Sequence, residues 1–141
     1  MKKKIAIIGS GIAGLTLANL LQNNSKSEII VYEKEEKLNL EEGFGIQLSV
    51  NCVSVLNKIG FNELNKNQKY KPLKLDFYSI RNNKICDLDL TRFNSKNDQY
   101  TTLKRSTLIK FLKEKLFSNT VIFGKKINDV KQFNNKLKIN F

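Results

Sequence analysis

The sequence has 141 residues, enough for one modest domain, and its 25 Lys and Arg outweigh 13 Asp and Glu to give a net charge of +12. It contains no histidine, which excludes Ser-His triads, histidine general bases and histidine metal sites within this segment, and we expect no metal. No apolar run approaches the ~20 residues that a membrane-spanning helix needs.

The first predicted element is a strand over residues 5–8, a short, β-branched apolar run that stops at a glycine. Three glycines follow in G-x-G-x-x-G spacing, namely Gly9, Gly11 and Gly14. In this motif the first glycine permits a tight turn, and the second lets backbone amides approach a pyrophosphate. The third lets the next helix lie close on the strand.

A helix is predicted over residues 12–22, directly after the glycine turn. Its first N–H groups and positive dipole end favour phosphate. Leu17, Leu20 and Leu21 recur at helical spacing, and we expect them to pack on the sheet.

A second strand is predicted over residues 28–32 and leads into Glu33, nineteen residues after Gly14. A carboxylate at this place can accept hydrogen bonds from both hydroxyls of an adenosine ribose and would repel a 2′-phosphate. Together the strand, turn, helix and acid predict a site for FAD or NAD(H) rather than NADP(H). The alternative is a glycine-rich helix start that binds nothing.

The basic start of the chain, residues 2–4, followed by apolar residues, also resembles a secretory signal peptide. The apolar region is interrupted, however, by three glycines and by Thr16 and Asn19. It is also not followed by a small-x-small cleavage site. The dinucleotide interpretation also explains Glu33, which a signal peptide does not.

The net positive charge raises a second alternative, nucleic-acid binding. The chain has only three arginines, Arg81, Arg92 and Arg105, and its lysines are scattered along the whole length. We therefore interpret the charge as a solvated surface and expect no nucleic-acid partner. Cys52 and Cys86 form no C-x-x-C pair and indicate core residues of a reduced, cytoplasmic protein.

Residues 34–42 are charged and aperiodic, which predicts an exposed loop. The two glycines around Phe44, in residues 43–48, indicate a close backbone approach or a plain turn. A short buried helix should then begin with Asn51 as its N-cap and stop at Gly60. We expect Cys52, Leu56 and Ile59 on its buried face.

Residues 61–71 are polar and predict a loop or a frayed turn. Leu73, Leu75 and Phe77 alternate with polar residues, as do Cys86, Leu88 and Leu90. With the turn at residues 81–84 between them, this pattern predicts a β-hairpin with one buried face.

The last third of the chain begins with a short link over residues 100–103. A helix is predicted over residues 106–117 with a buried stripe at Leu108, Phe111, Leu112 and Leu116. A strand over 120–123 and a closing hairpin, 130–133 with 137–141 around Asn134-Asn135, should follow. A parallel sheet needs more strands than these, so we expect the fold to be incomplete.

Four segments match one family in order: G-x-G-x-x-G-L-T-L-A, V-Y-E-K, G-F-G-I-Q-L-S-V-N and L-K-R-S-T-L. With them the chain resembles the N-terminal portion of the FAD-dependent aromatic hydroxylases, the single-component flavoprotein monooxygenases related to salicylate and p-hydroxybenzoate hydroxylases. The resemblance covers essentially the whole chain but only about the first third of a typical member. Many FAD and NAD proteins share the first two segments, and the last two select this family.

The resemblance implies that the glycine turn holds the FAD pyrophosphate and that Glu33 holds the adenosine ribose. Segment 43–45 matches a loop near the flavin, and Arg105 matches an arginine that reaches the cofactor. The family usually has proline where this chain has Val50, which we expect to alter loop rigidity more than cofactor choice. The implied cofactor-binding residues are Gly9, Ser10, Gly11, Ile12, Ala13, Gly14, Glu33, Lys34, Gly45 and Arg105.

The implied fold is α/β, a Rossmann-like FAD/NAD(P)-binding fold with an inserted β-hairpin or β-meander layer. We expect a nucleotide-binding start over 1–72, the start of a substrate-covering β layer over 73–100, and a return helix and strands over 101–141.

The implied function is the FAD-binding part of a monooxygenase that hydroxylates a small aromatic or related organic substrate with NAD(P)H and O₂. The family's later glycine–aspartate segments would lie beyond residue 141, so we do not expect these residues alone to turn over substrate. The alternatives are an NAD(H)-binding oxidoreductase module and a non-catalytic, basic nucleotide-binding remnant.

Overall fold

The computed structural model of the chain describes residues 2–40, 43–134 and 136–141. The chain divides into two compact units, one made of residues 1–42 with 112–141 and the other of residues 43–111. Residues 41 and 42 of the predicted loop, and Asn135 of the predicted closing turn, lie outside the described residues.

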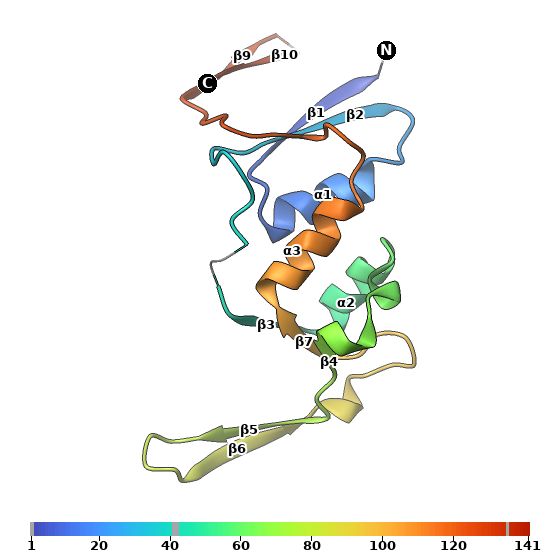
Figure 1. Cartoon of the computed structure of the whole chain (residues 1–141), viewed down its shortest axis with the longest axis vertical. Coiled ribbons are helices and arrows are strands. Elements are labelled where there is room, and N and C mark those ends of the chain that lie inside the picture. The colour runs from blue at the N-terminus through green and yellow to red at the C-terminus, as the bar shows by residue number, and fades with distance from the viewer. Residues whose placement is uncertain (1, 41–42, 135) are drawn as a thin grey trace. The chain divides into compact units, whose positions relative to one another are not determined.

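The first unit contains a parallel β-sheet of three strands, β1 (Lys3–Ile8), β2 (Ser27–Tyr32) and β8 (Val121–Ile122), in the order β1-β2-β8. Helix α1 (Ile12–Leu21) connects the first two strands and contacts both, which makes the βαβ arrangement that the sequence predicts. Figure 1 shows β1 and β2 side by side, next to α1.

The buried face of α1 differs from the predicted one. Leu15, Ala18 and Asn19 are buried, whereas Leu17 and Leu20 are 45% and 39% exposed. Helical spacing places residues on a common face but does not fix the rotation of the helix about its axis. That rotation follows from Gly14, because a Cβ at Gly14 would lie only 2.0 Å from the carbonyl oxygen of Gly9.

Asn19 links α1 to the end of helix α3 (Arg105–Glu114), whose last residues belong to the first unit. Its side-chain amide donates to the carbonyl oxygens of Leu15 and Leu112, both at 2.8 Å. The predicted stripe on α3 and just beyond it is confirmed, since all four of its residues are buried. The helix begins one residue before the predicted start and ends earlier.

The predicted closing hairpin is formed by β9 (Asp129–Phe133) and β10 (Lys136–Asn140), which pair antiparallel. The ring of Phe141, just after β10, lies 4.7 Å from the ring of Tyr32. This aromatic contact joins the end of the chain to the residue before Glu33.

The second unit contains a small antiparallel sheet with strand order β3-β7-β4. Its central strand occupies the segment that the sequence analysis assigned to a link, and the segment around Phe44 leads into a strand instead of a plain turn. The strands are β3 (Gly45–Leu48), β4 (Lys69–Tyr70) and β7 (Thr101–Lys104).

Helix α2 (Val50–Asn57) has Ser49 as its N-cap residue, so Asn51 lies inside the helix and the predicted cap is wrong. The buried residues are Val53 and Leu56, whereas Cys52 is exposed. Gly60 has a φ of +88°, which confirms it as the left-handed stop after the helix.

Two short 3₁₀ helices, η1 (Phe61–Glu63) and η2 (Lys66–Gln68), occupy the segment between α2 and β4 for which the sequence predicts a loop or a frayed turn. Phe61 is almost fully buried, at 1% exposure, and its ring meets the ring of Phe111 edge-on at 5.8 Å. This pair anchors the 3₁₀ segment on helix α3 within the second unit.

The predicted hairpin forms from β5 (Lys74–Tyr78) and β6 (Lys84–Asp89), but its buried face does not. Leu73, Phe77 and Leu88 are 65%, 48% and 39% exposed, and Cys86 is exposed as well. Only Leu90, just beyond the strands in the 3₁₀ helix η3 (Leu90–Arg92), is buried among the alternating residues that were expected inside.

No helix in the described part of the chain is long and apolar enough to span a membrane.

Candidate nucleotide-binding site

The turn between β1 and α1 has the geometry that the glycine motif requires. Gly9 has a φ of +92°, a conformation that residues with a Cβ rarely adopt. Its amide donates to the carbonyl oxygen of Tyr32 at 2.8 Å, which ties the turn to the end of β2. Gly14 allows α1 to approach this turn closely, as described above. The roles predicted for Gly9 and Gly14 within the fold therefore match the observed geometry.

Gly11 lies at the open side of the turn. It is the N-cap residue of α1, and a Cβ placed on it would have no heavy atom within 4 Å. The helix start has no side-chain cap and no acidic residue in its first turn. The amides of the first turn, which includes Ile12 and Ala13, are thus available to an anionic group, and Gly11 leaves the approach to them clear.

Glu33 follows β2 and lies against the same turn through Ser10. The backbone N–H and the hydroxyl of Ser10 both donate to Oε2 of Glu33 at 2.7 Å, and the amide of Glu35 donates to Oε1 at 3.2 Å. Burial alone would raise the pKa of Glu33, but these hydrogen bonds outweigh it and hold the pKa below its ordinary value. Glu33 is therefore an ionised acceptor at neutral pH.

The family resemblance implies Ser10 as a cofactor-binding residue only because it belongs to the turn. The structure gives it a further role, because Ser10 is 4% exposed and both of its donors fix one oxygen of Glu33. The motif spacing carries no information about this contact. A serine in the second position of the motif, combined with an acid after the second strand, is the sequence feature that could have indicated it.

Lys34 has an exposed side chain and its amino group lies 3.4 Å from a carboxylate oxygen of Glu35. This surface pair contributes little to stability. Binding of a cofactor by Lys34 stays a prediction.

The second unit brings together two predicted segments that lie far apart in the sequence. The amide of Arg105 donates to the carbonyl oxygen of Phe44 at 3.0 Å, and Gly45 pairs with Lys104 in the β3–β7 register. Gly43 has a φ of +93°, and a Cβ at this residue would lie 2.7 Å from Cδ of Arg105. Gly43 thus lets the arginine side chain lie against the backbone, while cofactor binding by Gly45 and Arg105 stays a prediction.

Comparison with known proteins supports the nucleotide-binding interpretation of the turn. Residues 7–39 match the family model of an NAD(P)-binding Rossmann-like domain. The chain is 42% identical over 60 residues to the 3-amino-4-hydroxybenzoate 2-monooxygenase of Streptomyces cremeus, an alignment that spans 43% of this chain and 15% of the relative.

Solved structures extend the similarity to the whole chain. HpxO of Klebsiella pneumoniae, complexed with FAD and uric acid, matches 99% of this chain with a TM-score of 0.79 and 20% identity. The 2,6-dihydroxypyridine-3-hydroxylase of Arthrobacter nicotinovorans matches 100% with a TM-score of 0.74 and 16% identity. At these identities the similarity shows a shared fold. This chain spans 35% of HpxO and 33% of the hydroxylase. The α/β, Rossmann-like fold predicted from the sequence is therefore present, and it corresponds to only a part of each of these proteins.

Proposed function

We propose that the first unit binds FAD, with the pyrophosphate at the glycine turn and the adenosine ribose at Glu33. The observation that carries this proposal is the Ser10–Glu33 contact, since it places an ionised carboxylate beside an uncapped helix start. The open approach at Gly11 and the ionised state of Glu33 both fit such a ligand.

The proposal extends to the reaction of the whole protein. We place these residues in a monooxygenase that hydroxylates a small aromatic or related organic substrate with NAD(P)H and O₂. Support comes from the hydroxylase and oxygenase whose folds match, from the FAD-complexed HpxO, and from the Streptomyces cremeus monooxygenase that 60 residues of the chain resemble. When bound, the flavin supplies the redox chemistry, while this chain's residues bind and orient its nucleotide portion.

Three further binding residues, Lys34, Gly45 and Arg105, belong to the proposal on the family resemblance alone. A cytoplasmic location belongs to it as well, because Cys52 and Cys86 are both free thiols.

A second candidate is an NAD(H)-binding oxidoreductase module. The matching family model is described as NAD(P)-binding, and it covers the turn and Glu33. NAD(H) and FAD share the adenosine diphosphate portion that this unit would hold, so the geometry of the turn accepts both.

Calorimetric titration of the chain with FAD, ADP-ribose, NADH and NADPH tests both candidates. If the first candidate is correct, FAD and ADP-ribose should both bind. NADPH should bind much more weakly than either, because Glu33 repels its 2′-phosphate. NADH binding more tightly than FAD would select the second candidate. Failure of all four ligands to bind would overturn both.

A further inference from the structure

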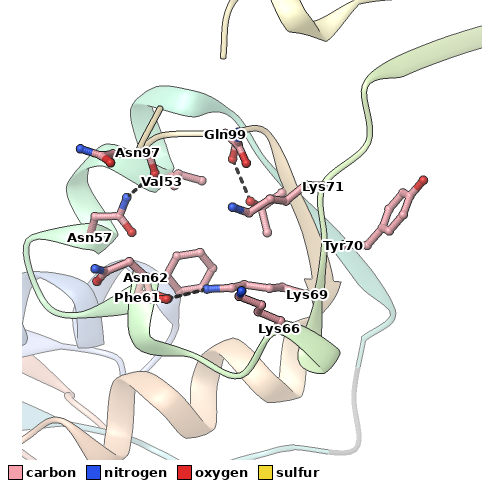
Figure 2. A pocket seen from close by; sticks show the side chains of 11 residues that line it. Val53, Asn57, Phe61, Asn62, Lys66, Lys69, Tyr70, Lys71, Asn97 and Gln99 are labelled. Carbon is pink, nitrogen blue, oxygen red and sulfur yellow. Dashed lines mark hydrogen bonds between the residues drawn. The ribbon is translucent and has the colours of Figure 1, made fainter. Parts of the chain in front are cut away.

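The second unit contains a cavity of about 370 Å³ that shares no residue with the glycine turn (Figure 2). It is open on one side and is lined by residues of α2, of the 3₁₀ helices η1 and η2, of β4 and of the segment that ends at the first residue of β7. A volume in this range suits a small ligand. Phe61 and Val53 supply apolar surface, and most of the remaining lining residues carry amide or amino groups.

The cavity has an unbalanced positive charge. Lys66, Lys69 and Lys71 line it, and none of the eleven described lining residues is acidic. Figure 2 shows the three amino groups turned toward the space beside Phe61. None of the three lysines has a carboxylate within ion-pair distance among the residues that the structure describes.

Lys69 is held in place by the walls of the cavity. Its amino group donates to the carbonyl oxygens of Phe61 at 2.9 Å and Asn62 at 3.2 Å, and lies 4.9 Å from the centre of the Phe61 ring. Burial, and then the charge of Lys71, lower the pKa of Lys69. An anion in the cavity would relieve the cost of this half-buried positive charge.

Asn57 is fixed in the wall of the cavity. Its side-chain nitrogen donates to the carbonyl oxygen of Asn97 at 3.1 Å and to Oδ1 of Asp98 at 2.8 Å. Its oxygen, Oδ1, is buried and has no hydrogen-bond partner among the described residues. Because this oxygen has almost no accessible surface, a ligand in the cavity does not reach it, and Asn57 serves to hold the segment at Asn97 and Asp98 against α2.

We propose that this cavity binds a small phosphate monoester. Lys66, Lys69 and Lys71 face its phosphate. A dianionic phosphate matches the charge of three ammonium groups better than a single carboxylate does. Apolar surface at Phe61 packs against the carbon skeleton.

The test is a titration of ¹⁵N-labelled chain with glycerol 3-phosphate, followed by NMR. The amide signals of Asn57, Phe61 and Gln99 should shift in a saturable manner. Signals of Gly9 to Ala13 report separately on phosphate at the glycine turn, so failure of this proposal is distinguishable from failure of the proposed nucleotide site. Absence of saturable shifts in the cavity would overturn the proposal.

Two further ligands test the contribution of charge. Neutral glycerol should not bind. Glycerate tests the carboxylate alternative, and tighter binding of glycerate than of glycerol 3-phosphate would overturn the assignment to phosphate.

A double variant, Lys66→Gln with Lys71→Gln, keeps the contacts of Lys69 and removes two charges from the cavity. It should weaken glycerol 3-phosphate binding by at least about tenfold. The matched control is Lys136→Gln with Lys138→Gln, which removes two exposed charges from β10 in the first unit. Equal weakening in both double variants would show that binding follows net charge, and would overturn the site.

Discussion

Ser10 and Glu33 are joined by two hydrogen bonds to a single oxygen. The backbone N–H and the hydroxyl of Ser10 both lie 2.7 Å from Oε2 of Glu33, although the two residues are 23 positions apart. The contact connects the glycine turn to the end of β2, and so fixes the carboxylate next to the start of α1. Ser10 therefore acts as a positioning residue, while Glu33 is the residue proposed to meet the ribose.

The first prediction concerns the pH dependence of Ser10→Ala. The folded-state pKa of Glu33 lies below its ordinary value of 4.5, so its ionised form stabilises the fold above that pH, and this contribution is lost as the pH falls through the folded-state pKa. Ser10→Ala removes one of the bonds that hold the pKa down. The variant should be less stable than wild type near neutral pH, and the difference should shrink in acid.

Urea unfolding at a series of pH values measures this difference. The control is Ser10→Ala in a Glu33→Gln background, where no carboxylate is present and the effect of the serine should not depend on pH. A difference between Ser10→Ala and wild type that stays constant from neutral to acidic pH would mean that Ser10 acts through packing alone.

The second prediction is a change of nucleotide preference in Glu33→Gln. Loss of the charge should weaken ADP-ribose binding by about tenfold, because a hydrogen bond to an ionised carboxylate becomes one to a neutral amide. It should also narrow the gap between NADH and NADPH, since the repulsion of a 2′-phosphate disappears. The matched control is Glu35→Gln, which removes a nearby exposed charge. If both variants bind all ligands alike, the role of Glu33 is wrong.

The third prediction contrasts two glycines of the motif. Gly14→Ala should destabilise the fold by several kcal/mol or shift α1, because its Cβ would lie 2.0 Å from the Gly9 oxygen. Gly11→Ala meets nothing within 4 Å and has a φ of −72°, so its stability should change by no more than about 1 kcal/mol. Its affinity for ADP-ribose should nevertheless fall sharply.

Thermal unfolding and calorimetry separate these two effects. Normal nucleotide affinity in Gly11→Ala would show that the ligand does not approach the backbone at this position. Wild-type stability in Gly14→Ala would show that α1 can move away from β1 without cost.

The parts of the fold that the sequence predicts are those decided by local rules. Gly9 needs a positive φ, Gly14 needs a close helix contact, and Glu33 follows the strand that pairs with β1. Each requirement involves residues of one βαβ unit, so the motif determines it. The turn at Gly60 was also predicted correctly, because a left-handed residue directly after a helix is a local requirement as well.

The parts that were missed depend on contacts between distant segments. Residues 101–104 form a central strand only because β3 and β4 pair with them from more than thirty positions away. The cavity residues Lys66 and Lys69 come from a segment without periodicity, and the helical pattern around Asn57 does not indicate which segment packs beside it, so no pattern in the sequence brings the three together. Alternation along the hairpin predicted a buried face, but alternation does not show what would cover it.

The fourth prediction follows from the two cysteines, which the sequence analysis expected in the core. Both Cys52 and Cys86 are exposed thiols, on α2 and β6 respectively. An aromatic disulfide reagent should therefore modify two thiols per native chain, at rates close to those in denaturant. Cys52→Ser and Cys86→Ser should each leave one reactive thiol. A thiol that reacts only after unfolding would show that its side chain is covered in solution.

The fifth prediction compares two positions on α1. Asn19 is 2% exposed and donates to two carbonyl oxygens, so Asn19→Ala should cost about 2–3 kcal/mol by removing two buried hydrogen bonds. Leu17→Ala, at a side chain that is 45% exposed, should cost less than about 1 kcal/mol. Urea unfolding of both variants measures the difference. The reverse order would mean that α1 is rotated in solution so that its leucine face packs on the sheet, as the helical spacing alone suggested.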